Sequence, residues 1–88
     1  MKFPKMIQSF MLHNVTKVFV YKGKPLYSAQ YMKIGSYVNL FIHSKAHKSG
    51  KQSYTIEIKG TIIEGMESLD ECITVAEALL IENNMFMN

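Results

Sequence analysis

The middle of the chain is a succession of short apolar runs separated by turn residues. β-Branched and aromatic residues recur through 15–22, 26–33, 36–43 and 52–59, a pattern that predicts strands. Lys22-Gly23-Lys24-Pro25 supplies the turn between the first two runs, because glycine tolerates a positive φ and proline fixes its own. Since the connections are short, we expect neighbouring strands to pair antiparallel.

Other segments of the chain are less regular. The run 6–13 is interpreted as a possible additional strand, and 44–51 as a polar loop. The run 52–59 is expected to continue past Gly60 to residue 63 through a bulge. At the C-terminus, the apolar residues of 85–87 are expected to anchor the tail, with fraying as the alternative.

The last third of the chain predicts one amphipathic helix. Ser68-Leu69-Asp70-Glu71 matches a capping box, and Asn83-Asn84 is the expected stop. Between them, apolar residues recur at helical spacing on one stripe: Leu69, Cys72, Ile73, Ala76, Leu79 and Leu80. The expected fold is therefore α+β, an antiparallel four- to five-stranded β-meander with one C-terminal helix packed on one face. Residues 1–88 would form a single small domain.

Charge divides the chain into a basic and an acidic part. Residues 1–59 hold all ten lysines and a single acid, Glu57, which gives +9. Residues 60–88 hold six acids and no lysine, which gives −6 and accounts for the net charge of +3. Such an asymmetry points to a charged partner. The absence of arginine removes the bidentate fork that reads guanine edges, while lysine still attracts phosphate.

Composition also indicates the cellular environment and the kind of source expected for the protein. Cys72 is the single cysteine, so an intramolecular disulfide is excluded and a reducing, cytoplasmic location is expected. No apolar run has the length needed to span a bilayer. The many Lys, Ile and Asn residues are typical of an AT-rich genome, and they suggest an accessory protein of a phage or mobile element.

Alternation along the strands predicts two different faces of the sheet. One is aliphatic, with Val18, Val20, Leu26, Met32, Val38, Leu40 and Ile42. The other is aromatic and lysine-bearing, with Phe19, Tyr21, Tyr27, Tyr31, Tyr37 and Phe41. Three interpretations of the aromatic face remain open: stacking on unpaired bases, burial against a protein partner or a second copy, or a curled sheet that buries the rings in its own core.

The loop from His43 to Lys51 is the most basic stretch of the chain. Its lysines could reach phosphates, and the turn lysines would join them if the hairpins lie side by side. The alternative is a solvated loop. The candidate nucleic-acid-binding residues are Lys17, Lys22, Lys24, Lys33, Lys45, Lys48, Lys51, Tyr21, Tyr27, Tyr31, Tyr37 and Phe41.

Catalysis and metal binding have weaker support in the sequence. Cys72 lies on the apolar stripe of the helix, so it is interpreted as a buried small side chain rather than a nucleophile. His43 and His47 have a spacing found in metal sites, but a second pair of ligands at a recognised spacing is missing. We therefore expect no enzyme activity, no metal and no cofactor.

The sequence leaves two hypotheses for function. The first is a small binding protein that recognises RNA or single-stranded nucleic acid through lysines and aromatic residues, and thereby modulates a host system. The alternative is a protein-binding inhibitor or adaptor that acts through the aromatic face or the acidic C-terminal helix. A homodimer is compatible with both, and a membrane partner is not expected.

Overall fold

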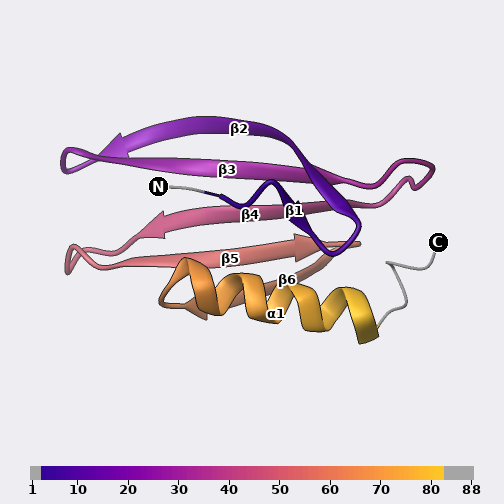
Figure 1. Cartoon of the computed structure of the whole chain (residues 1–88). Helices are drawn as coiled ribbons and strands as arrows, with labels where there is room; N and C mark the ends of the chain where they lie inside the picture. The colour runs from indigo at the N-terminus through magenta and orange to yellow at the C-terminus, as the bar shows by residue number, and fades with distance from the viewer. Residues whose placement is uncertain (1–2, 83–88) are drawn as a thin grey trace.

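The computed structural model describes residues 3–82 and shows an antiparallel sheet followed by one helix (Figure 1). The elements are β1 (Met6–Ile7), β2 (Phe10–Tyr21), β3 (Lys24–Met32), β4 (Asn39–Ala46), β5 (Gln52–Ile58), β6 (Thr61–Met66) and α1 (Leu69–Glu82). The six strands lie in the order in which they occur along the chain. The expected α+β meander is confirmed, although four to five strands was an undercount.

Two local turns account for the difference in strand number. A turn at Gln8 and Ser9 divides the 6–13 run, and its second part joins the next run to form the twelve residues of β2. Lys59 and Gly60 have φ values of 49° and 80°. Two successive positive φ values are typical of a tight hairpin turn. The chain therefore reverses at Gly60 and returns as β6, and the expected continuation through a bulge is wrong.

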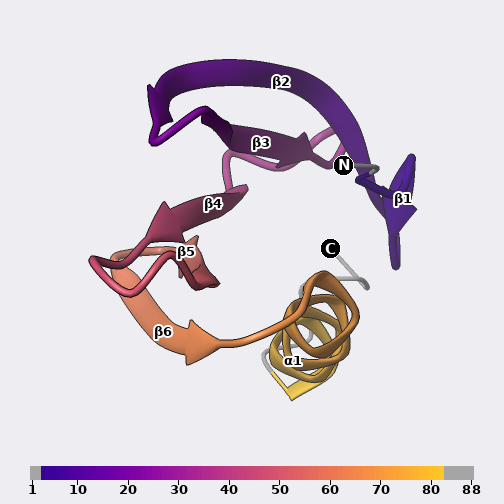
Figure 2. The ribbon, with the colours of Figure 1, turned by 90° about the vertical axis from the view of Figure 1, so that its left-hand side faces the viewer.

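The sheet curls around its own core, and α1 lies in the mouth of the curl (Figure 2). The helix packs against β5, β6 and β1. The buried apolar side chains form one cluster: Ile7, Phe10, Ala29, Tyr31, Leu40, Ile42, Tyr54, Ile56, Ile58, Met66, Cys72, Ala76 and Leu80. Burial is thus concentrated on the concave face of the sheet.

The predicted helix start and apolar stripe are both confirmed. The Ser68 hydroxyl accepts a hydrogen bond from the Glu71 N–H at 3.1 Å. The Glu71 carboxylate accepts from the Glu67 N–H at 3.0 Å, one residue earlier than in a standard capping box. Cys72, Ala76 and Leu80 are buried. The expected stop at Asn83-Asn84 and the anchoring of the tail fall outside the described residues.

The two faces of the sheet agree with prediction on β4 but only in part on β3. Leu40 and Ile42 on β4 point into the core, as expected. On β3, Leu26 is buried as predicted, but Ala29 and Tyr31 pair with these two core residues and face inward instead of Met32. Tyr31 is consequently fully buried, whereas Met32 is exposed. The expected open face of six aromatic rings does not form.

The exposed valines of β2 are a second departure from the predicted faces. Alternation predicts Val18 and Val20 on the core side, but their exposed fractions are 61% and 50%. A register shift between Lys17 and Phe19 interrupts regular pairing with β3. Beyond it, the hairpin of β2 and β3 extends past the part of the sheet that α1 covers (Figures 1 and 2). The side chain of Phe19 is outside what the structure describes.

Tyr31 ties the N-terminal segment to the core. Its hydroxyl donates a hydrogen bond to the Pro4 carbonyl at 2.7 Å. A buried phenol requires such an acceptor, because an unpaired hydroxyl in an apolar setting is costly. The segment before β1 is thereby held against the central strands.

We expect Tyr31→Phe to lower the free energy of unfolding by about 1–2 kcal/mol, because the Pro4 carbonyl loses its donor while the ring still fills its place. Urea denaturation measures the change. Tyr37→Phe is the matched control, since Tyr37 is fully exposed, and it should leave stability unchanged. Equal stability of all three proteins would contradict the anchoring role of Tyr31.

Candidate nucleic-acid interface

Two hairpin tips lie side by side at one end of the sheet (Figure 1). The first is the turn at Lys22 and Gly23, whose φ values of 51° and 78° suit a tight hairpin. The second is the 47–51 loop, closed by a hydrogen bond of 3.0 Å from the His47 N–H to the Lys51 carbonyl. The Lys22 ammonium donates to the Lys48 carbonyl at 3.1 Å. The structure therefore places the lysines of both tips on one surface.

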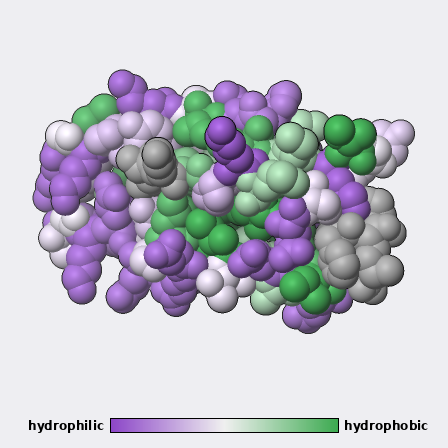
Figure 3. All heavy atoms as spheres, viewed as in Figure 1, coloured by the Kyte–Doolittle hydropathy of each residue, from purple (hydrophilic) through white to green (hydrophobic). Residues whose placement is uncertain are grey.

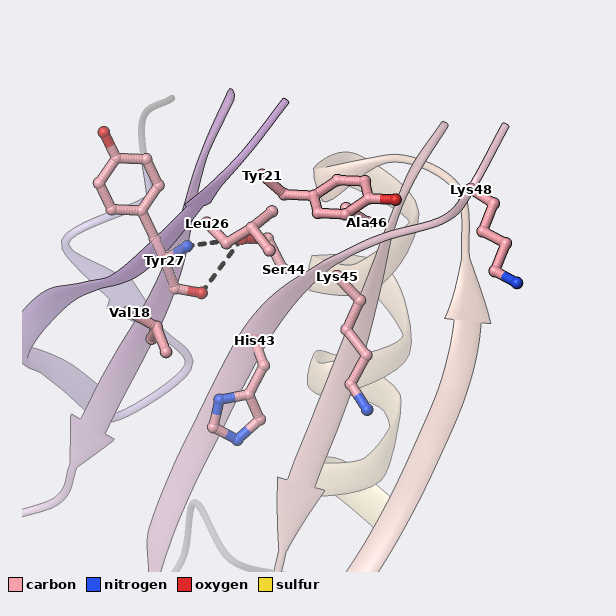
Figure 4. Close-up of a pocket in the computed structure, with 9 residues that line it drawn as sticks. All are labelled: Val18, Tyr21, Leu26, Tyr27, His43, Ser44, Lys45, Ala46 and Lys48. Carbon is pink, nitrogen blue, oxygen red and sulfur yellow. Dashed lines mark hydrogen bonds between the residues drawn. The ribbon is translucent and has the colours of Figure 1, made fainter. Parts of the chain in front are cut away.

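A cleft opens between the two hairpins because β3 and β4 part before they reach their tips. Their backbone pairing ends at Ser28 and His43. One residue further, the Ser44 hydroxyl accepts from the Tyr27 N–H at 2.7 Å and donates to the Tyr27 carbonyl at 3.2 Å (Figure 4). The Ser44 side chain thus takes the place of a backbone partner, and it satisfies both the N–H and the C=O of Tyr27 where the strands separate.

The cleft has a volume of about 470 Å³, within the range of small-molecule sites. Its walls come from β2, β3, β4 and the loop after β4: Val18, Tyr21, Leu26, Tyr27, His43, Ser44, Lys45, Ala46 and Lys48. Figure 4 shows the ring of Tyr21 extended toward Ala46, whereas the ring of Tyr27 points away from the other labelled side chains. The half-buried Tyr21 therefore offers a ring to a ligand in the cleft.

Exposed lysines lie along the cleft, at Lys45 and Lys48, and in the two hairpin tips beside it. They are Lys22, Lys24, Lys45, Lys48 and Lys51, and hydrophilic side chains gather over this end of the molecule (Figure 3). The Lys22 ammonium also lies 5.5 Å from the centre of the Tyr21 ring. Lys45 pairs with Glu64 of β6 at 3.5 Å, but both groups are exposed and such pairs are weak. Lys22 and Lys48 are joined across the cleft and define its basic rim.

The remaining predicted site residues are not brought to this cleft. Lys33 and Tyr37 belong to the β3–β4 connection at the opposite end of the sheet (Figure 1). Phe41 lies on the convex face, stacked on His43 with ring centres 5.8 Å apart. Lys17 is exposed on β2, opposite Tyr27 in the register. Tyr31 is buried and has no surface to offer, so its inclusion among the binding residues is wrong.

A polar row across the convex face has no signal in the local sequence pattern. The Ser28 hydroxyl and His43 Nδ1 are 2.8 Å apart, and His43 Nε2 lies 3.2 Å from Glu57 Oε1. The three residues stand on adjacent strands, so only the register brings them together. Because β3 is paired on both sides, the backbone of Ser28 is engaged in the sheet, and Ser28 takes part in the row through its side chain. The row holds the His43 ring in a fixed orientation at the wall of the cleft.

His47, which has the spacing from His43 that is found in metal sites, also makes a side-chain hydrogen bond. His47 Nε2 lies 2.9 Å from the Ser53 hydroxyl. Across residues 3–82, no group of three or more His, Cys, Asp or Glu side chains is arranged to hold a metal ion. Within the same residues, no helix is long and apolar enough to cross a membrane.

Cys72 is a buried thiol at the start of α1, as the apolar stripe predicted. Burial, and to a smaller degree the nearby Glu71 charge, raises its pKa to about 11. Burial, followed by the influence of Cys72, raises the pKa of Tyr31 to about 12. Both groups therefore stay protonated at neutral pH, and the thiolate needed for nucleophilic chemistry is disfavoured.

We expect the free energy of unfolding to fall as the pH rises from 9 toward 12. The unfolded chain releases these protons near the ordinary pKa values of 9.0 and 10.0, whereas the folded chain holds them to about 11 and 12. High pH thus favours the unfolded chain, by about 1.4 kcal/mol per pH unit for each group between its two pKa values, 9.0 to about 11 for Cys72 and 10.0 to about 12 for Tyr31. Urea denaturation at several pH values from 9 to 12 should show a shallower decline in the free energy of unfolding for Cys72→Ala. A decline identical to that of the unsubstituted protein would contradict the assignment.

A comparison of the chain with protein-family models, curated proteins and solved structures finds no match. The geometry of the cleft and its rim is therefore the basis on which a function is inferred.

Proposed function

We propose that the protein binds single-stranded nucleic acid, RNA in the first place, at the cleft between the two hairpin tips. The observation that carries the proposal is the meeting of two lysine-bearing tips, joined by the bond from Lys22 to Lys48, around a cleft with an aromatic wall. Lysines on the rim attract successive phosphates, and the ring of Tyr21 accepts a base.

The lining of the cleft supports an unpaired strand as the ligand. Stacking on an aromatic ring requires a base that is free of its partner, which a loop or a single strand provides. All cations of the rim are lysines, so phosphate attraction has little geometric selectivity. The proposed binding is therefore salt-sensitive and tolerant of sequence.

The proposal confines the site to one end of the sheet, and charge reversal tests this. Lys22→Glu with Lys48→Glu should weaken binding to a single-stranded RNA by about tenfold or more, and reduce the salt slope by about 0.7 for each phosphate that the variant no longer neutralises. Fluorescence anisotropy over a range of salt concentrations measures both. Lys33→Glu with Lys59→Glu is the matched control, because it makes the same change in net charge at the other end.

Two outcomes of this titration would overturn the proposal. One is an absence of binding by the unsubstituted protein at low salt. The other is an equal loss of affinity in both double variants, which would indicate general attraction by net charge instead of a site at the tips.

The aromatic part of the site has its own test. Tyr21→Ala should weaken binding by about 1–3 kcal/mol if a base stacks on this ring. Tyr37→Ala removes an exposed tyrosine at the far end of the sheet and should leave the affinity unchanged. Equal effects of the two substitutions would argue against a base in the cleft.

The protein-binding alternative has narrower support. Its aromatic surface is divided, because Tyr31 is in the core and Phe41 lies on the convex face. What remains is the exposed acidic start of α1, with Glu67, Asp70 and Glu71. A complex that forms through this surface would survive nuclease treatment and the Lys22 and Lys48 reversals.

A further inference from the structure

Three exposed methionines lie next to one another across the first three strands. Met6 of β1 is the register partner of Met11 of β2, and Met11 is in turn the partner of Met32 of β3. Their exposed fractions are 53%, 50% and 37%. Each is next in the chain to a buried core residue: Ile7, Phe10 and Tyr31, respectively. Because successive side chains of a strand point to opposite faces, the three methionines form one row on the outer face of the sheet, the methionine row.

The spacing of the methionine row allows its three sulfurs to converge. Register partners in an antiparallel sheet have Cβ atoms about 4.5–5.5 Å apart. The outer two residues, Met6 and Met32, are separated by two strand spacings, about 9–10 Å. Methionine is unbranched and has three rotatable bonds, so both outer side chains can turn toward Met11 without a change in the backbone. One ion above Met11 is therefore within reach of three thioethers.

The surroundings of the row select the kind of ion. Thioether sulfur is a soft, neutral donor that favours Cu(I), whereas Mg²⁺ and Ca²⁺ take oxygen ligands. The chain holds no Asp or Glu before Glu57, so β1, β2 and β3 offer no carboxylate. A hollow beside the row is lined by Met11, Met32, His13 and Lys33, among others. The Lys33 ammonium repels a divalent cation more strongly than a monovalent one. Donor type and charge thus both favour a soft monovalent ion.

We propose that the methionine row binds one soft monovalent metal ion, Cu(I), through the thioether sulfurs of Met6, Met11 and Met32. The expected absence of a metal rested on the spacing of histidine and cysteine, and methionine sulfur is a different kind of donor. The row lies where β2 begins and β3 ends, toward the end of the sheet opposite the lysine-bearing tips (Figure 1). The proposal therefore stands whether or not the cleft binds RNA.

Methyl NMR of the full chain with Ag(I), a soft monovalent ion that is stable in air, tests the site directly. Silver nitrate in chloride-free buffer should shift the ε-methyl resonances of Met6, Met11 and Met32 and reach saturation at one ion per chain. The methyl of Met66, which is buried in the core, should stay unshifted. Zn(II) at the same concentration should leave all of these methyl resonances in place, because it is a poorer match for thioether donors.

Substitution of the central methionine tests the ligands. Met11→Leu keeps the size of the side chain but removes the sulfur, and it should weaken Ag(I) binding by about tenfold or more, the loss found even for residues that only support a metal ligand. Isothermal titration calorimetry measures the affinity. Met66→Leu makes the same change in the core, and Cys72→Ala removes the buried thiol; both should leave the affinity unchanged. Circular dichroism confirms that each variant is folded.

Four outcomes would overturn the proposal. The first is an absence of Ag(I) binding, and the second is binding that shifts His13 or other groups while the three methyl resonances of the row stay in place. The third is a loss of affinity in Cys72→Ala as large as that in Met11→Leu, which would make the thiol the ligand. The fourth is saturation at half an ion per chain, which would indicate a site shared between two chains.

Discussion

A single helix of fourteen residues has to cover the apolar face of a six-stranded sheet. The helix is about 21 Å long, whereas β2, with twelve residues, extends for about 40 Å. A flat sheet of this size would leave much of its apolar face in water. The sheet therefore curls until β5, β6 and β1 meet the helix, and the core forms inside that curl.

The short length of the helix also explains where a binding site is expected. The hairpin-tip ends of β2, β3 and β4 lie beyond the helix, so side chains there do not have to pack in the core. Ser44 completes the hydrogen bonds of Tyr27 where the strands part, which allows a cleft without unpaired backbone at that point. Ligand binding would thus use the region that the helix cannot reach.

The faces of β3 show where prediction from alternation fails. Both sets of side chains in this strand are partly apolar, with Leu26 and Met32 on one side and Ala29 and Tyr31 on the other. Alternation indicates which residues share a face, but not which face turns inward. The smaller Ala29 lies opposite Ile42, and the Tyr31 hydroxyl reaches the Pro4 carbonyl. These long-range contacts, which no local pattern contains, select the inward face.

The sequence by itself determined the features that depend on neighbours along the chain. The α1 stripe, the Ser68 cap and the Lys22-Gly23 turn follow from helical periodicity, side-chain capping and glycine's tolerance of positive φ. Only the tertiary structure decided that the two lysine-bearing tips meet, that Ser28, His43 and Glu57 form a row, and that β2 keeps an open edge. Each of these depends on strand register and sheet curvature, which are set by the packing of residues far apart in the chain.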